Sequence, residues 1–108
     1  MKREKTEKNL RQYERMRAVF PDSWNRTSLG ATISTLEFLL EAIEECDQDW
    51  KCRFQKQWGI LEEVNAFVLD EGRPDFSNGE QTLIERAAES LKALIEDAES
   101  ALTKLASD

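Results

Sequence analysis

Residues 83–105 read LIERAAESLKALIEDAESALTKL and carry the most regular apolar pattern in the chain. Its apolar residues recur every three or four positions, which places them on one face of an α-helix. The alanines among them allow a neighbouring helix to approach closely. The stripe consists of Leu83, Ile84, Ala87, Leu91, Leu94, Ile95, Ala98, Ala101, Leu102 and Leu105. We expect a long helix here, capped by Ser77 or Asn78 and ending at about residue 106.

A weakly amphipathic helix is expected at residues 4–19. Its thin apolar stripe consists of Leu10, Tyr13, Met16 and Phe20. Residues 1–8 have no apolar partner on this face, so we expect them to fray. Pro21 ends the helix because it lacks an N–H and restricts the residue before it.

A second helix is expected at residues 28–46, capped by Thr27 or Ser28. Its core stripe consists of Leu29, Ile33, Leu36, Leu40 and Ile43, which are spaced by three or four residues. We expect Phe38 and Leu39 to widen this stripe on one side. The opposite face carries the carboxylates of Glu37, Glu41, Glu44 and Glu45.

A third helix is expected at residues 49–71, capped by Asp47 or Asp49 and ended by Gly72. Its apolar residues cover an arc of roughly 200°, wider than the ~100° stripe of a surface helix. This helix is therefore central, or it keeps part of its apolar face for a partner. Gln57 and Asn65 fall inside the arc. Because buried polar groups need partners, these two residues mark a side of this helix that is solvent-exposed or contacts another chain.

The four helices predict an all-α fold, an up-down-up-down four-helix bundle, because short connectors between long helices favour antiparallel neighbours. The 108 residues are enough for one domain, spanning residues 1–108. With 4 Gly and 2 Pro, the chain has too few turn residues for an all-β fold.

Composition excludes several kinds of site. The sequence contains no histidine, which removes Ser-His and Cys-His nucleophile pairs. Cys46 and Cys52 alone do not make a zinc site, and we expect both to be free thiols. No apolar run is long enough to span a bilayer, and the charged start does not resemble a secretory signal. We therefore expect a cytoplasmic protein that does not bind membranes.

Charge is distributed unevenly along the chain. The formal net charge is −7. Residues 1–20 hold seven Lys or Arg and three Glu, a net charge of +4, whereas the remainder holds 8 basic and 19 acidic residues, a net charge of −11. A basic arm for nucleic acid is one interpretation. We favour a basic helix lying against an acidic body, because that body would repel a polyanion.

Carboxylates of two helices are a candidate metal site. Glu41, Glu44 and Glu45 of the second helix, together with Glu62 and Glu63 of the third, suit the oxygen preference of Mg²⁺. Such pairs on adjacent helices resemble those of helical nucleotide pyrophosphatases, which implies phosphohydrolase activity. However, Asn65 and Ala66 stand where that family has an aspartate. Because the acidic strip lies opposite the core stripe, a solvated helix face is the interpretation we prefer.

Trp50, Phe54 and Trp58 lie on successive turns of the third helix. Aromatic residues at this spacing are usually part of a core. They are also enriched in protein interfaces, and with basic neighbours they can stack on nucleic-acid bases.

These observations favour a non-catalytic module that binds another, basic protein, as an adaptor, inhibitor or immunity-type protein does, and that needs no cofactor. The residues expected to bind the partner are Glu37, Glu41, Glu44, Glu45, Trp50 and Trp58. The alternatives are the Mg²⁺-dependent phosphohydrolase and a homodimer formed through the third or fourth helix.

Overall fold

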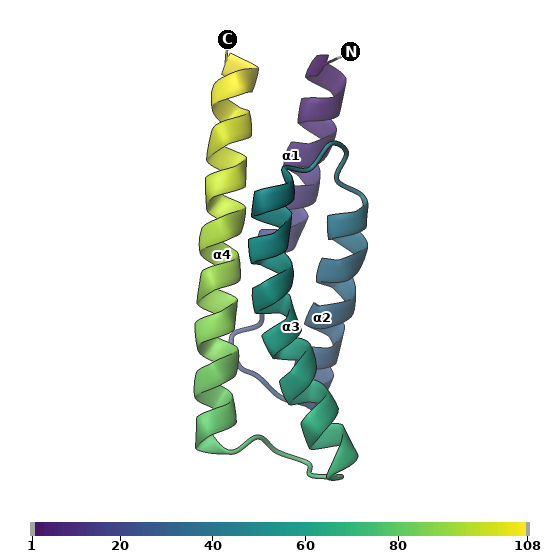
Figure 1. Cartoon of the computed structure of the whole chain (residues 1–108), viewed down its shortest axis with the longest axis vertical. Coiled ribbons are helices and arrows are strands. Elements are labelled where there is room, and N and C mark those ends of the chain that lie inside the picture. The colour runs from purple at the N-terminus through teal and green to yellow at the C-terminus, as the bar shows by residue number, and fades with distance from the viewer. Residues whose placement is uncertain (1, 108) are drawn as a thin grey trace.

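The computed structural model describes residues 2–107 as four α-helices with no strand among them. The helices are α1 (Lys2–Ala18), α2 (Arg26–Glu41), α3 (Gln48–Asp70) and α4 (Asn78–Ser107). Each runs antiparallel to the next, which confirms the predicted up-down-up-down bundle (Figure 1). The upper end holds both chain termini and the α2–α3 connector, residues 42–47. The lower end holds the α1–α2 connector, residues 19–25, and the α3–α4 connector, residues 71–77.

The helices form a closed ring around one core. α1 packs against α2 and α4, and α3 packs against the same two helices. Each helix therefore has two neighbours, and its remaining surface faces solvent. Burial of each large apolar side chain contributes about 1.5–3 kcal/mol to folding. The largest fully buried side chains are those of Phe54, Met16, Leu29, Leu36, Leu61, Ile84, Leu91, Ile95 and Val68.

Two indole N–H groups of α3 form hydrogen bonds to its neighbouring helices. Trp50 Nε1 donates to the carbonyl oxygen of Leu94 in α4 (2.8 Å), and Trp58 Nε1 donates to that of Ile33 in α2 (2.9 Å). The Tyr13 ring of α1 meets Trp50 edge-on, with ring centroids 5.4 Å apart. These contacts fix the rotation of α3 about its own axis, because both indoles would lose a partner if the helix turned.

Side-chain caps start three of the helices. Asp47 caps α3 and accepts from Trp50 N (3.0 Å). Of the two predicted caps, Asp47 and Asp49, the first is therefore confirmed. Ser77 caps α4. The prediction for α2 was wrong, since Asn25 is the cap and accepts from Ser28 N (2.9 Å). Ser28 occupies the third helical position and completes a reciprocal capping box.

α2 ends at Glu41, five residues earlier than its sequence pattern predicts. The side chain of Asn9 in α1 explains this end. Asn9 Oδ1 accepts from Glu44 N (3.0 Å), and Asn9 Nδ2 donates to Glu44 O (2.8 Å). The Glu44 amide is thereby drawn out of the helical pattern, and Glu45 turns the chain in a left-handed conformation with φ of 54°. Glu44 and Glu45 consequently lie in the connector and not on the helix.

The C-terminal end of α3 is set by hydrogen bonds between residues close together in the sequence. Gly72 adopts a φ of 66°, its N–H bonds to Leu69 O (3.0 Å), and Arg73 N bonds to Val68 O (3.2 Å). This pattern of hydrogen bonds is a Schellman motif, which favours glycine at the left-handed position. The predicted role of Gly72 at the end of this helix is confirmed.

α1 is docked on the bundle in spite of its thin stripe. Tyr13 and Met16 are buried, and Arg17 Nε forms an ion pair with Glu99 Oε1 of α4 (2.5 Å). The helix extends back to Lys2, and Lys5 Nζ reaches Glu45 Oε1 (2.8 Å). Fraying of residues 1–8 stays a prediction, and Met1 lies outside the described residues.

A search of residues 2–107 for a helix that is both long enough and apolar enough to cross a bilayer found none.

Candidate protein-interaction surface

The outer face of α2 carries the most exposed large apolar side chain of the described residues. Phe38 is 70% exposed. Its predicted place beside the core stripe is wrong, because Phe38 lies about 200° around the helix from Leu36 and Leu40. Of the two residues expected to widen the stripe, only Leu39 is buried, at 3% exposure. Phe38 therefore faces away from both neighbouring helices.

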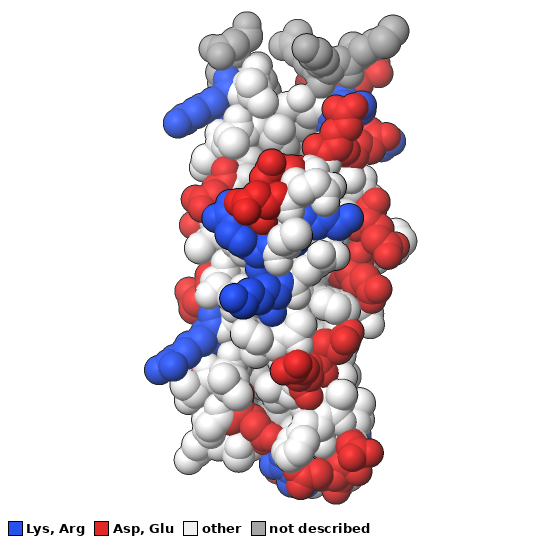
Figure 2. Space-filling view, viewed as in Figure 1, with Lys and Arg blue, Asp and Glu red and all other residues white. Residues whose placement is uncertain are grey.

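Carboxylates surround this phenylalanine along the sequence. Glu37 and Glu41 are exposed on α2, and Glu44 and Glu45 are exposed in the connector that follows. In Figure 2 acidic side chains gather along the edge of the molecule formed by α2. The four predicted carboxylates thus remain on the surface, although they do not share one helix face as the sequence pattern indicates. We call Glu37, Phe38, Glu41, Glu44 and Glu45 the acidic face.

The two tryptophans of the predicted site lie elsewhere. Trp50 is 7% exposed and Trp58 is partly buried. Each donates its indole N–H to a backbone carbonyl oxygen of a neighbouring helix. The core interpretation of Trp50 and Phe54 is confirmed. The structure therefore does not bring the tryptophans together with the acidic face.

α3 leaves part of its wide apolar arc exposed, and the interpretation that this part serves a partner stays a prediction. Phe67 is 56% exposed and Leu69 is 49% exposed. The Phe67 ring lies 5.7 Å from the Arg73 guanidinium carbon, a cation–π distance.

The carboxylates of the metal hypothesis are not assembled into a site. Glu62 and Glu63 are exposed on α3, and Glu44 and Glu45 have left the α2 helix. Throughout residues 2–107 no three Cys, Asp or Glu side chains lie close enough to hold one metal ion. Within the described part of the chain, the five carboxylates of this hypothesis therefore do not converge on one point.

A hollow of about 310 Å³ lies at the upper end between α1, α4 and the α2–α3 connector. Tyr13, Cys46, Trp50 and Leu102 are among its lining residues. Burial raises the pKa of the Tyr13 hydroxyl and of the Cys46 thiol. Both groups therefore stay protonated at neutral pH, and this hollow offers apolar surface without an activated nucleophile. Cys46 and Cys52 are free thiols, as expected.

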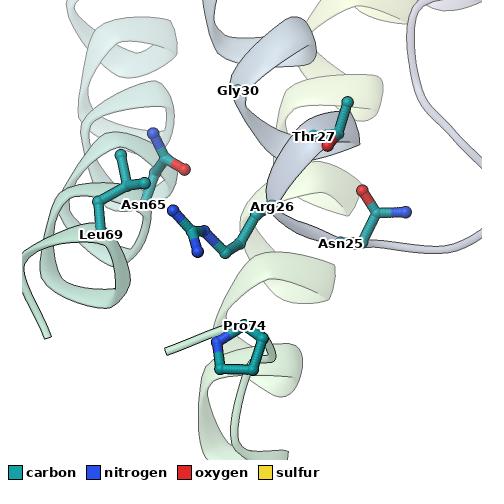
Figure 3. A pocket seen from close by; sticks show the side chains of 7 residues that line it. All are labelled: Asn25, Arg26, Thr27, Gly30, Asn65, Leu69 and Pro74. Atoms are coloured by element: carbon teal, nitrogen blue, oxygen red, sulfur yellow. The ribbon is translucent and has the colours of Figure 1, made fainter. Parts of the chain in front are cut away.

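A second pocket, of about 620 Å³, lies at the lower end between the start of α2 and the last turns of α3 (Figure 3). Its lining consists of Asn25, Arg26, Thr27, Gly30, Asn65, Leu69 and Pro74. The sequence offered one signal for it, the polar Asn65 inside the apolar arc of its helix. Arg26 gave no signal, because a basic residue at a helix start has no distinctive spacing.

Comparison of the sequence with protein-family models and with curated proteins, and of the structure with solved structures, found no match.

Proposed function

We propose that this chain is a non-catalytic protein-interaction module that binds a basic partner protein through its acidic face. The observation that carries the proposal is Phe38, 70% exposed beside Glu37 and Glu41. A single large aromatic side chain within a charged rim matches the usual anatomy of a protein interface, in which an apolar centre is surrounded by polar groups.

Electrostatics favour a basic partner. The chain carries a formal net charge of −7. Such a charge speeds encounter with positively charged proteins and disfavours acidic ones. Once docked, burial of Phe38 supplies about 1.5–3 kcal/mol of apolar stabilisation.

Adaptor, inhibitor and immunity-type proteins share this mode of action, because each acts by occupying a surface of its partner. We place the activity in the cytoplasm, where free Cys46 and Cys52 are maintained by the reducing conditions.

The test is an affinity capture from the native lysate, with bound proteins identified by mass spectrometry. One variant, the acidic-face variant, changes the part of the acidic face that lies on α2, by Glu37→Gln, Phe38→Ala and Glu41→Gln. The matched control makes the same changes on α3, as Glu62→Gln, Glu63→Gln and Phe67→Ala, so its net charge is equal and it also loses one exposed phenylalanine. We expect one basic protein to bind the native chain and the control stoichiometrically and to be lost from the acidic-face variant.

Circular dichroism of both variants checks that the helices remain formed. Retention of the partner by the acidic-face variant would contradict the proposed surface, and an acidic partner would contradict the proposed chemistry. If the captured protein is a second copy of this chain, light scattering at two concentrations will show a dimer, and the homodimer alternative replaces the proposal.

A further inference from the structure

The apolar stripe of α4 continues beyond the helix that packs against it. Trp50, in the first turn of α3, donates to Leu94 O, and α4 runs on from there to its end. In Figure 1 the ends of α1 and α4 rise above the α2–α3 connector. In this part of α4 Leu102 is only partly buried, and Leu105 is 66% exposed. The upper end therefore presents apolar surface that the described residues do not cover.

Two adjoining hollows lie along this surface. The first is the hollow of about 310 Å³ described above, and the second, of about 560 Å³, lies beside it between α1, α4 and the connector. Asn9, Glu45 and Leu102 line both of them, whereas Trp50 lines only the first and Leu105 only the second. We call the two hollows together the upper groove.

The length of the upper groove suits a short piece of extended chain. Asp97 and Leu105 both line it from α4, and they are eight residues apart in the sequence. A helix rises 1.5 Å per residue, so they are separated by about 12 Å along its axis. An extended chain covers this distance in three to four residues, at about 3.3 Å each.

The rim of the upper groove is negatively charged. Four carboxylates line it, those of Glu44, Glu45, Asp47 and Asp97, and Lys5 lines it as well, paired with Glu45 (2.8 Å). Lys51 follows Asp47 by one turn of α3, and with it included the rim has four carboxylates against two lysines, a net charge of −2. Among the described residues no three carboxylates converge on one point, so this rim suits cations spread along a chain and not a metal ion.

We propose that the upper groove binds an extended segment of the basic partner protein, in which a large apolar side chain stands between two lysines or arginines. The apolar side chain packs against Ala101 and Leu102, and the two cations reach the rim carboxylates. Lysine and arginine suit this position because their methylene stems pack on apolar surface while their charged ends stay in water. The inference rests on the proposed function, since Glu44 and Glu45 belong both to the acidic face and to this rim.

The test uses a synthetic peptide, acetyl-Gly-Lys-Phe-Lys-Gly-amide, titrated into the ¹⁵N-labelled full chain and followed by NMR. A charge control has glutamate in place of both lysines, and an apolar control has serine in place of the phenylalanine. We expect saturating shifts of the Trp50 indole N–H and the Ala101 amide, and no shift of the Trp58 indole N–H at the α2–α3 interface. Both controls should bind at least tenfold more weakly, and added salt should weaken binding of the lysine peptide.

A pair of leucine variants tests the apolar part of the groove. Leu105→Gln changes a groove residue, and Leu83→Gln makes the same change at the opposite end of α4, where Leu83 is 49% exposed. Neither side chain belongs to the buried core, so we expect both variants to keep their helices in circular dichroism. Leu105→Gln should weaken peptide binding about fivefold or more, and Leu83→Gln should leave it unchanged.

A pair of acidic variants tests the rim. Asp97→Asn and Glu96→Gln each remove one negative charge from exposed neighbours on α4, but Asp97 lines the upper groove and Glu96 lines a different hollow beside Arg17. We expect a two- to fivefold loss of affinity for Asp97→Asn, about the size of an exposed ion pair, and a smaller loss for Glu96→Gln.

Five results would overturn the proposal. They are the absence of saturating shifts, equal binding by either control peptide, equal affinities of Leu105→Gln and Leu83→Gln, equally tight binding of 2-phenylethylamine, and the same shifts on concentrating the chain alone. The last two would assign the groove to a small amine or to a second copy of this chain.

Failure of this inference can be told apart from failure of the proposed function. The acidic-face variant changes only Glu37, Phe38 and Glu41, none of which lines the upper groove. A captured partner that this variant loses but Leu105→Gln retains would show that the partner uses the acidic face without the groove.

Discussion

The two connectors of α3 reach the same result, a reversal of the chain, by different means. The lower connector, residues 71–77, is held mainly by groups close to it in sequence, and Arg26 Nη1 adds one distant contact to the backbone oxygen of Arg73 (3.1 Å). The local groups are the Schellman motif at Gly72 and the reciprocal capping of Ser77 and Glu80 (3.2 and 2.8 Å). The upper connector, residues 42–47, is held from a distance by Asn9, thirty-five residues before Glu44 in the sequence.

The difference separates local from tertiary control of a helix end. The end of α3 is set by local sequence, because glycine takes the left-handed conformation without the cost that an L side chain adds. At the end of α2, by contrast, the backbone of Glu44 pairs with a side chain of another helix, Asn9 of α1. Substitutions at matched positions of the two connectors test whether each helix end is controlled locally or by a distant side chain.

The largest effect is expected from Asn9→Ala. Asn9 is 7% exposed, and its loss leaves the N–H and C=O of Glu44 without their partners. We expect a loss of about 2 kcal/mol in the free energy of unfolding, compared with about 1 kcal/mol for Ser77→Ala, which removes one cap. Urea unfolding of both variants measures this difference. A smaller loss for Asn9→Ala than for Ser77→Ala would show that the upper connector holds itself.

The next effect concerns the two left-handed residues, Gly72 and Glu45. An L side chain in this conformation costs about 1 kcal/mol relative to glycine. We therefore expect Gly72→Ala to destabilise the chain by about that amount. At the other connector, Glu45→Gly should be more stable than Glu45→Ala by a similar amount. Because both Glu45 variants lose the exposed ion pair with Lys5, their difference isolates the backbone. Equal stabilities of the two Glu45 variants would contradict a left-handed conformation at that position.

The smallest effect is a pH dependence confined to the lower connector. The Arg73 guanidinium, aided by Ser77, lowers the pKa of the Glu80 carboxyl to about 2. A carboxyl whose pKa is lower in the folded than in the unfolded state stabilises the fold above its unfolded pKa, near 4.5. We expect this stabilisation to be complete above about pH 5 and to fade as the pH falls toward 2.

Urea unfolding of the native chain and of Glu80→Gln between pH 6 and pH 2 measures this pH-dependent stabilisation by the Glu80 carboxylate. The difference between the two proteins should shrink steadily on acidification. A constant difference over this range would show that the ion pair with Arg73 contributes nothing to the folded state. Asn9 does not titrate, so the corresponding comparison of Asn9→Ala with the native chain should not show this fading.

The sequence predicted the features that local rules govern. The stripe of α4, the end of α3 at Gly72 and the antiparallel order of four helices all follow from spacing and turn chemistry. The end of α2 could not be predicted, because the amide that interrupts it belongs to another helix. The predicted position of Phe38 was wrong for a different reason. Phe38 is adjacent in sequence to the buried Leu39, but neighbouring residues of a helix point in different directions, and Phe38 faces solvent.

The candidate sites were harder to predict than the fold. The four surface carboxylates are exposed, as their pattern indicates, but nothing in the sequence pairs them with an exposed aromatic side chain. Of the two tryptophans predicted to bind a partner, Trp50 is buried and Trp58 is partly buried, and each donates its indole N–H to a neighbouring helix. Arg26 and Asn65 are thirty-nine residues apart, and only the packing of α2 against α3 places them on one pocket.

The indole hydrogen bonds of α3 also give the molecule two built-in optical reporters. Trp50 reports on the interface between α3 and α4, and Trp58 reports on the interface between α3 and α2, because each indole is hydrogen-bonded to a carbonyl of the neighbouring helix. The third tryptophan, Trp24 in the α1–α2 connector, also emits. Once Trp24 is replaced by phenylalanine, replacing Trp50 or Trp58 as well leaves emission from the other one alone. The order in which the α3–α4 and α2–α3 interfaces open during unfolding can therefore be read from the intrinsic fluorescence of these variants, without attaching a dye to either free cysteine.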